Sequence, residues 1–355
     1  KPAKAASAES GARSVAKSAK APADPPNRSG GSPANGVSDK VVNGVALTHP
    51  DRIFWPHDRI TKLDLVTYYD SVAEQMLPYV LGRPVAMVRC PGGIGDLPAP
   101  VRQGRSRVGE CFFHKHPGED FPGPFEKVMI TESGGTAPYL TISEPASLTA
   151  LAQMGVLEIH IWGSTWPDIE HPDLLVFDLD PDPSVDWPTL AAAARLMKDT
   201  LDSLGLVSFV KTTGGKGLHV VAPVTPSGDW SSVRPFCKGV ADAVVREAPD
   251  KFTSNMLKAK REGKIFIDYV RNNRGATSVA PYSTRAKERA TVAVPLRWSE
   301  LSGRIRPDTY TVKTLRNRLG RLEGDPWEDY SKVRRSQSLT AKAMEAVSTL
   351  NRERT

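Results

Sequence analysis

Two carboxylates stand at the end of an apolar run, in the segment LLVFDLDPDP at residues 174–183. The run predicts a buried strand that stops at the Pro-Asp-Pro turn. Because side chains alternate along a strand, Asp178 and Asp180 share one face, about 6.6 Å apart along the chain. Two bare carboxylates at this spacing repel each other. The pattern therefore indicates either a site for divalent cations or a nucleophilic aspartate.

A third acid, Asp268, interrupts the apolar segment IFIDYV at residues 265–270. Removing an unpaired carboxylate from water is costly, so Asp268 needs a cation as its partner. That cation is either a metal shared with the first two acids or a nearby arginine such as Arg271. Three carboxylates are a usual set for two divalent ions in phosphoryl or nucleotidyl transfer.

A glycine-rich segment, KTTGGKGLH at residues 211–219, has the composition of a phosphate-binding turn. Its first two glycines free backbone N–H groups, and Lys216 and His219 add positively charged or hydrogen-bonding side chains. The segment is not a Walker A loop, because the leading glycine and the hydroxyl residue after the lysine are both missing. Without other evidence, a hairpin turn with a surface lysine explains it equally well.

The segment CFFHKH at residues 111–116 allows two functional interpretations. Cys111 and the two histidines resemble zinc ligands, but their spacing is irregular and no fourth ligand is nearby. Phe112 and Phe113 point to opposite faces of an extended chain, so one can join the core while the other stacks on a base. Two core aromatics are the alternative.

The positive charge of the chain is concentrated at its ends. The 355 residues carry a formal charge of +7, but the first 40 residues hold seven Lys or Arg against three Asp or Glu, and the last 25 hold six against two. The overall charge is therefore a weak argument for nucleic acid, and local clusters must carry it. Three basic clusters stand out, and two of them flank the proposed metal ligands. They are Arg102/Arg105/Arg107, Lys258/Lys260/Arg261/Lys264 and Arg271/Arg274/Arg285/Lys287/Arg289.

The spacing of apolar residues predicts which elements carry these side chains. A helix capped by Thr61 is expected over 60–83, and a hairpin around Gly134-Gly135. Strands and helices then alternate, which predicts an α/β or α+β fold with mixed sheets flanked by helices. The expected strands are 83–90, 174–180, the two arms of 207–224, and 264–270; further helices are expected at 187–204 and 231–248.

Three segments differ in composition. Residues 1–40 are rich in Ala, Ser, Pro, Gly and Lys and predict a disordered linker. Residues 41–305 predict the catalytic domain, and 306–355 a helical or tail-like C-terminal extension. Three cysteines without a CxxC pair, Cys90, Cys111 and Cys237, argue against disulfides. No signal-peptide or membrane-spanning pattern is found, so we expect a soluble intracellular piece of a longer protein.

Nine segments run in the order of one known family over about residues 45–300. They resemble the polymerase domain of bacterial ligase D, a member of the archaeo-eukaryotic primase superfamily that acts in non-homologous end joining. The segments are LTHPDRIFWP, ITKLD, GRPVAMVRCPGG, CFFHKH, LEIHIW, LVFDLDPDP, TTGGKGLHV, FIDYVRNNRGATSVAPYSTRAK and VAVPLRW.

The resemblance implies a role for each matching residue. Asp178, Asp180 and Asp268 would be catalytic and hold two Mn²⁺ or Mg²⁺ ions. The NTP or dNTP substrate would contact Thr213, Gly214, Lys216, His219 and Arg285. A 5′-phosphate on DNA would be bound by Arg52, Lys62 and Arg89. Phe112 and Phe113 would stack on the template, and His160 would face the DNA.

The resemblance also implies the function: a nucleotidyltransferase that fills gaps and extends 3′ ends, preferentially with ribonucleotides, at double-strand breaks. Its partners would be DNA ends with a 5′-phosphate, gapped duplex, a ligase domain and a Ku-type end-binding protein, in the bacterial cytoplasm at the nucleoid and not at a membrane. The chain itself lacks the KxDG motif of nick sealing. Two alternatives stay open: a haloacid-dehalogenase-type phosphatase with Asp178 as nucleophile, and a catalytically inert module that binds DNA ends.

Overall fold

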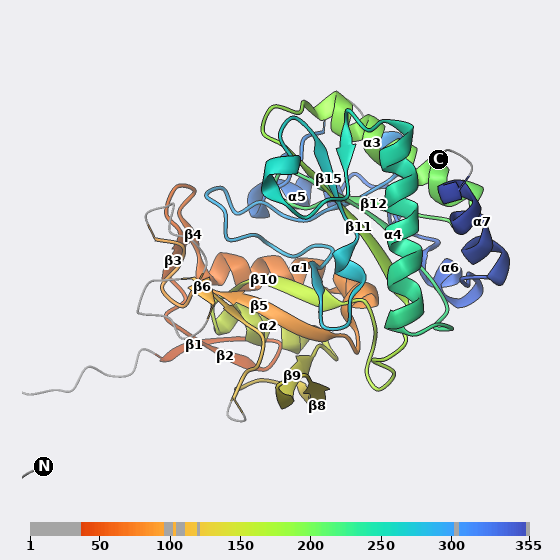
Figure 1. The fold of residues 1–355 in the computed structure, drawn as a ribbon. Helices are drawn as coiled ribbons and strands as arrows, with labels where there is room; N and C mark the ends of the chain where they lie inside the picture. Colours follow the sequence, from red (N-terminus) through yellow and green to blue (C-terminus); the bar gives the residue numbers. More distant parts are fainter. Residues whose placement is uncertain (1–36, 96–101, 104–110, 119–120, 302–304, 353–355) are drawn as a thin grey trace, which may run out of the picture. The chain divides into compact units, whose positions relative to one another are not determined.

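The structure, a computed structural model, describes residues 37–95, 102–103, 111–118, 121–301 and 305–352 of the 355-residue chain. These residues form two large sheets with helices packed against them (Figure 1), which confirms the predicted mixed α/β class. The predicted linker lies outside the described residues as far as residue 36, and the first strand begins at Val37.

The first large sheet has seven strands, in the order β16-β10-β5-β7-β6, with β9 joining β5 and β8 joining β9. The turn between β8 and β9 confirms the hairpin predicted around Gly134. The strands are β5 (Pro84–Arg89), β6 (Arg102–Gln103), β7 (Phe112–His114), β8 (Glu126–Glu132), β9 (Gly135–Thr141), β10 (Val156–Trp162) and β16 (Thr277–Val279). Two short pairs precede it: β1 (Val37–Val42) with β2 (Val45–Thr48), and β3 (Ile53–Trp55) with β4 (Ile60–Thr61).

Helices α1 (Lys62–Val80) and α2 (Pro145–Gln153) pack against each other, and α2 also packs on β10. Thr61 is the N-cap of α1, as predicted. Its hydroxyl accepts from the Asp64 N–H at 3.2 Å, and the Asp64 carboxylate accepts from the Thr61 N–H at 2.8 Å. This capping box satisfies two backbone donors that the first helical turn leaves free.

The second large sheet has six strands in the order β14-β15-β11-β13-β12-β17. It carries the segments that the sequence singled out for chemistry, and helices α3 (Trp187–Ser203) and α4 (Trp230–Glu247) pack on it. Figure 1 shows α4 beside β11, while α1 and α2 lie with β5 and β10. The strands are β11 (Leu174–Pro181), β12 (Phe209–Thr212), β13 (Leu218–Pro223), β14 (Phe252–Thr253), β15 (Ile265–Asp268) and β17 (Pro295–Leu296).

The C-terminal segment contains α5 (Val312–Leu319), α6 (Tyr330–Ser336) and α7 (Ala341–Arg352). It is packed into the rest of the chain: α7 lies against α4, and Arg334 pairs with the fully buried Asp173, which also binds Arg83 at 2.6 Å. Among the described residues, no helix is long and apolar enough to cross a membrane.

The expectation of no disulfide is wrong, because Cys90 and Cys111 are bonded to each other. Antiparallel pairing of β5 with β7 places Arg89 opposite Phe112. Cys90 follows Arg89 and Cys111 precedes Phe112, so the two cysteines face each other across the strand pair, with Cα atoms 4.3 Å apart. Strand register brought together two cysteines that are distant in sequence, and CxxC spacing carries no information on register. Cys237 is free and buried.

Candidate active site

The three predicted acids come from neighbouring strands of the six-stranded sheet. Asp178 on β11 lies directly opposite Asp268 on β15 and, on its other side, opposite His219 on β13. Asp180 follows two residues later on β11, on the same face. Asp178, Asp180 and His219 line a cavity of about 640 Å³. Strand pairing thus brings the three acids close together, although Asp268 is not among the residues that line the cavity.

Two long cations neutralise these acids. The Arg271 guanidinium lies 3.2 Å from Asp178 and 3.2 Å from Asp268. The Lys216 ammonium lies 3.2 Å from Asp180 and donates to the Pro181 carbonyl at 2.7 Å. The arginine alternative foreseen for Asp268 is therefore present, but the same arginine also serves Asp178.

Divalent metal ions are the alternative partners for these acids. As the side chains stand, no group of three His, Cys, Asp or Glu among the described residues is arranged around a common metal position. However, Arg271 and Lys216 are 39% and 57% exposed, so both can swing away from the carboxylates. What would remain is three carboxylates from two paired strands, two of them lining the cavity, and carboxylate oxygens are the ligands that Mg²⁺ and Mn²⁺ prefer. The donor set fits divalent ions.

The pKa values of the neighbouring acids Asp178 and Asp268 are shifted in opposite directions. Burial disfavours the charged form of Asp178, but His219 and Arg271 more than compensate and hold its pKa well below the usual range. Burial and the charge of Asp178 raise the pKa of Asp268, and the charge of Arg271 only partly offsets this. Burial and the nearby Lys211 lower the pKa of His219 to about 4, so its ring is neutral at pH 7. An added positive charge near these two acids would stabilise the charged form of both.

The glycine-rich segment forms the turn between β12 and β13 at the edge of this cavity. The Thr213 hydroxyl accepts from the Gly215 N–H at 3.2 Å and donates to the Gly217 carbonyl at 3.1 Å, which closes the turn. A Cβ atom on Gly217 would lie 2.4 Å from the Leu179 carbonyl oxygen. A side chain at position 217, where a Walker A loop carries a hydroxyl residue, would therefore collide with the backbone of β11.

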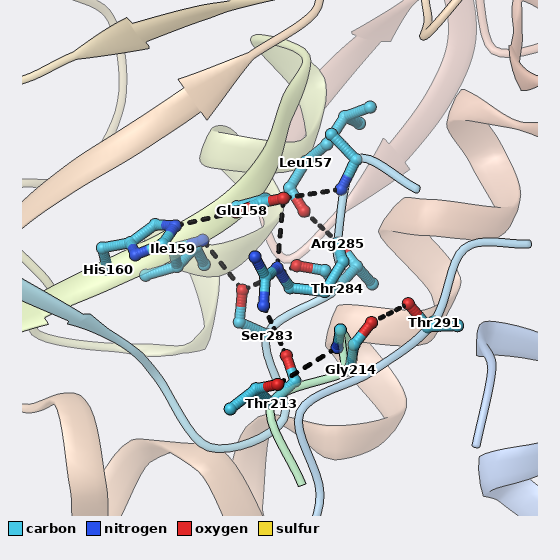
Figure 2. A network of polar contacts seen from close by, with 12 residues as sticks. Leu157, Glu158, Ile159, His160, Thr213, Gly214, Ser283, Thr284, Arg285 and Thr291 are labelled. Atoms are coloured by element: carbon cyan, nitrogen blue, oxygen red, sulfur yellow. Dashed lines mark hydrogen bonds and ion pairs between the residues drawn. The ribbon is translucent and has the colours of Figure 1, made fainter. Parts of the chain in front are cut away.

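Arg285 reaches the same turn from outside the sheet. Its Nη1 donates to the Thr213 carbonyl at 2.5 Å, and a Cβ on Gly214 would lie 2.8 Å from its Cγ (Figure 2). Gly214 is further held by a hydrogen bond from the Thr291 hydroxyl to its carbonyl. Lys287 and Arg289 line the cavity beside Arg285. The predicted nucleotide contacts thus line one cavity, together with Asp178 and Asp180; its five lysine and arginine residues face four acids in all, including Glu288 and Asp308.

Sequence reasoning missed one buried acid of this region, Glu158 on β10. It is 5% exposed, lies 2.8 Å from His160 and forms an ion pair with Arg285 at 3.1 Å. The argument that singled out Asp268, a carboxylate inside an apolar segment, applies equally to Glu158 in LEIHIW and would have found it. His160 itself borders the cavity.

The three residues predicted to bind a 5′-phosphate gather near the C-terminal end of α2. Lys62 donates to the Thr48 carbonyl at 2.7 Å and lies 3.3 Å from the Gln153 side chain. Arg89 donates to the Met154 carbonyl, and Arg52 to the Pro91 carbonyl at 2.9 Å. Burial and the charge of Arg52 lower the pKa of Lys62 to about 8. None of the three lines the cavity at the acids.

Phe112 and Phe113 on β7 face opposite ways, as predicted from their adjacency. Phe112 lies beside the Arg89 guanidinium, 5.6 Å from its centre, whereas Phe113 packs on the core and lies edge-on to His160 at 6.0 Å. The zinc interpretation of this segment finds no support. Cys111 is in a disulfide and His116 pairs with Glu132 at 3.1 Å.

The basic clusters separate in space. From the third cluster, Arg271, Arg285, Lys287 and Arg289 line the cavity, whereas Arg274 pairs with Glu170 at 2.7 Å. No residue of the second cluster lines it. In the first cluster, Arg105 and Arg107 lie outside the described residues. The argument for a phosphate-rich ligand therefore rests on the third cluster.

Comparison with known proteins agrees with this geometry. The model of the family "LigD, primase-polymerase domain" matches residues 61–327. The chain is 36% identical over 316 residues to the multifunctional non-homologous end joining protein LigD of Pseudomonas aeruginosa, covering 88% of this chain and 36% of that protein. It is 34% identical over 267 residues to the corresponding DNA repair protein of Mycobacterium tuberculosis, covering 72% of this chain and 33% of that one.

A solved structure, the polymerase domain of Mycobacterium tuberculosis ligase D in complex with DNA, superposes with a TM-score of 0.72 at 31% identity. The superposition covers 82% of this chain and 99% of that one. The chain therefore corresponds to one domain and spans about a third of the length of these multifunctional relatives. It belongs to the LigD primase-polymerase domain family, a family of nucleotidyltransferases.

Proposed function

We propose that this domain extends DNA 3′ ends and fills short gaps, with a preference for ribonucleotides, as the polymerase step of bacterial end joining. The observation that carries the proposal is the pairing of Asp178 with Asp268 across β11 and β15, with Asp178 at the wall of a cavity that Arg271, Arg285 and Lys287 also line. The related protein solved with DNA supports a DNA substrate. Family membership leaves no support for the phosphatase alternative.

In this proposal Asp178, Asp180 and Asp268 hold two divalent ions, Mn²⁺ or Mg²⁺. Bound ions would lower the pKa of the attacking hydroxyl and neutralise charge on the leaving pyrophosphate. The oxygen of the primer 3′-hydroxyl forms a bond to the α-phosphorus of the nucleotide, and the bond to pyrophosphate breaks. Arg271 and Lys216 must leave the carboxylates first, and both then become free to bind phosphate oxygens.

The other residues of the cavity bind and orient the nucleotide. The turn at 213–217 offers backbone N–H groups, and Lys216, Arg285, Lys287 and Arg289 offer positive charge to the triphosphate and its leaving group. His219 is held neutral by its burial and stays next to Asp178, at 3.4 Å. Its neutral ring is available as a hydrogen-bonding partner for the substrate rather than as a charge.

The DNA would be held away from the chemistry by a second set of residues. Arg52, Lys62 and Arg89 form a cluster of cations suited to a terminal 5′-phosphate on the far side of a gap. Phe112 and Phe113 offer ring faces near Arg89 and His160, where a template base can stack. A ligase domain and a Ku-type protein would be partners in the bacterial cytoplasm, at the nucleoid, because the named relatives are multifunctional end-joining proteins.

The decisive experiment is extension of a gapped duplex that carries a 5′-phosphate at the downstream strand. We expect extension with Mn²⁺ or Mg²⁺, faster with NTP than with dNTP, and faster with the 5′-phosphate than with a 5′-hydroxyl. Release of phosphate from a phosphomonoester without extension would point to a phosphatase. Tight binding of the duplex without extension under any of these conditions would point to an inert end-binding module.

A further inference from the structure

The carboxylate of Glu158 lies between the two halves of the proposed active site. It sits on β10 directly after a bulge: Val156 pairs with Arg89 and Glu158 pairs with Val88, so Leu157 is an extra residue on that strand. A bulge redirects the side chains that follow it. Glu158 reaches Arg285, and its neighbours Leu157 and Ile159 bind Thr284 and Ser283 through their backbone, as Figure 2 shows. His160 contacts the other side of the Glu158 carboxylate.

Each oxygen of this carboxylate serves a different side of the site. Oε1 lies 3.1 Å from Arg285 Nε and accepts a hydrogen bond from the Ala286 N–H at 2.9 Å. Oε2 lies 2.8 Å from His160 Nε2. An ionised carboxylate only accepts hydrogen bonds, so the proton of His160 is on Nε2. Burial raises the pKa of Glu158, but Arg285, His160 and the Ala286 N–H together lower it to about 2.

The two partners of Glu158 lie on the sides of the site proposed for two different ligands. Arg285 continues to the Thr213 carbonyl at 2.5 Å, and so to the turn proposed to bind the triphosphate. His160 borders the cavity and lies 6.0 Å from the ring of Phe113, on the side proposed to face DNA. A single buried charge therefore fixes the orientation of one residue on the nucleotide side and one on the DNA side.

We propose that Glu158 is a positioning residue that couples Arg285 to His160, and thereby nucleotide binding to DNA binding; the inference rests on the proposed function of this site. A glutamine at this position has one acceptor oxygen and one donor group. With its oxygen toward Arg285, it satisfies His160 only if the His160 ring moves its proton to Nδ1, so the protonation of His160 observed here is lost. Loss of the charge also leaves the partly buried Arg285 guanidinium without its carboxylate partner.

The test is a set of double-mutant cycles on binding, which need no turnover. We would measure the dissociation constants of ATP with Mn²⁺ and of the gapped 5′-phosphorylated duplex for Glu158→Gln, Arg285→Ala, His160→Ala and their pairs. We expect Glu158→Gln to weaken ATP binding by about 10- to 100-fold, because it removes the carboxylate that forms the ion pair with Arg285. In the Arg285→Ala background this loss should largely vanish, while the effect of Glu158→Gln on duplex binding persists. In the His160→Ala background the reverse should hold.

A matched control is Glu300→Gln. Glu300 also pairs with an arginine, Arg318, and accepts from a backbone N–H, that of Arg297 at 2.8 Å, but it does not line the cavity. It should lower thermal stability without changing either dissociation constant. Losses for Glu158→Gln that are the same in all backgrounds, or that match those of the control, would overturn the proposal.

Two further measurements keep the outcome decisive. If Glu158→Gln does not fold, the dissociation constant of ATP is measured with and without saturating duplex for the wild type, Arg285→Ala and His160→Ala, because coupling between the two sites makes each ligand change the affinity for the other. A duplex effect on ATP affinity that is absent in the wild type, or unchanged in both variants, would refute the coupling. Extension by the wild-type domain is measured alongside: its absence would refute the proposed function, while the binding cycles would still decide the role of Glu158.

Discussion

At the scale of single residues, the site consists of acids whose charge is compensated by cations that can leave. Asp178 and Asp268 share Arg271, whereas Asp180 shares Lys216. Permanent structural ion pairs usually involve buried partners on both sides, as for Arg83 with Asp173, which are 2% and 0% exposed. Here Asp178 and Asp268 are largely buried while Arg271 is 39% exposed, which is the arrangement expected where a ligand replaces the cation.

The first prediction concerns Asp268. Replacing it with alanine removes one of three carboxylates that would hold the ions, so extension should fall by at least about 100-fold, the scale set by loss of one strong electrostatic group. Binding of 5′-phosphorylated duplex should change little, because Arg52, Lys62 and Arg89 are untouched. Primer extension and a fluorescence binding assay would measure both quantities.

The matched control is Asp202→Ala, which removes an acid paired with Lys198 on the surface of α3 and should leave both measurements unchanged. Extension that survives in Asp268→Ala would mean that this acid does not hold a metal ion, and the assignment of the site would have to be abandoned.

The second prediction is a pH dependence from Lys62. Its pKa is lowered from 10.5 to about 8 by burial and by Arg52, so the ammonium loses its proton as pH rises through this value. A bound 5′-phosphate favours the charged form, and its own second pKa of about 6 keeps its charge constant above pH 7. The preference for 5′-phosphate over 5′-hydroxyl duplex should therefore decrease from pH 7 to pH 9.

Dissociation constants of both duplexes at several pH values would test this. Lys62→Arg should make the preference independent of pH, since an arginine stays charged throughout this range. A wild-type preference that stays constant from pH 7 to pH 9 would show that Lys62 does not contact the phosphate, or that it is charged throughout.

At the scale of elements, strand register determines which residues of the site lie side by side. Asp268, Asp178, His219 and Lys211 form one row across β15, β11, β13 and β12, each opposite the next. The sequence predicted each strand and the face that Asp178 and Asp180 share, because alternation is a local property. It did not predict the row, because no single segment of the sequence determines the order of the strands in a sheet.

The same reasoning explains what was missed. The Cys90–Cys111 disulfide and the bulge before Glu158 both depend on how β5 pairs with its neighbours β7 and β10. Local patterns identified the helix after Thr61 and the hairpin at Gly134, whose signals are capping and turn residues. The resemblance of whole segments supplied the remaining site residues, and the structure then showed which of them share a cavity.

The third prediction concerns the turn between β12 and β13. A Cβ on Gly217 would lie 2.4 Å from the backbone oxygen of Leu179, which belongs to the strand that carries Asp178 and Asp180 and cannot simply move aside. Gly217→Ala should therefore displace the turn from β11 and raise the dissociation constant of ATP by about tenfold or more, a cost of about 1.4 kcal/mol.

Gly215→Ala is the comparison within the same turn. Its Cβ would meet only side-chain atoms, of Thr213 at 3.3 Å and of Arg285 at 3.7 Å, so its effect should be clearly smaller. Calorimetric titration with ATP and Mn²⁺ would rank the two variants. Equal affinities for both variants would show that the turn does not need its contact with β11 to bind nucleotide.

At the scale of the whole molecule, the C-terminal segment belongs to the same folded unit as the site. Trp327 is 3% exposed, packs against Tyr79 of α1 and donates to the Val210 carbonyl of β12 at 3.1 Å. Gln337, after α6, donates to the Pro223 carbonyl of β13 at 2.8 Å. Two strands of the six-stranded sheet therefore take part of their support from residues beyond the predicted boundary at residue 305.

This arrangement leads to the last prediction. Trp327→Ala should lower the free energy of unfolding by about 3–5 kcal/mol, the usual cost of removing a large buried aromatic side chain. Because Trp327 touches β12 and α1 together, the loss should shift the urea midpoint of the whole domain, with far-UV circular dichroism and loss of ATP binding moving in parallel. Trp298→Ala, at a partly buried tryptophan that donates to the Ser208 carbonyl at 2.8 Å, should cost less. If the two probes separate in Trp327→Ala, so that ATP binding survives while part of the circular dichroism signal is lost at low urea, the C-terminal segment is an independent appendage and the catalytic sheet stands without it.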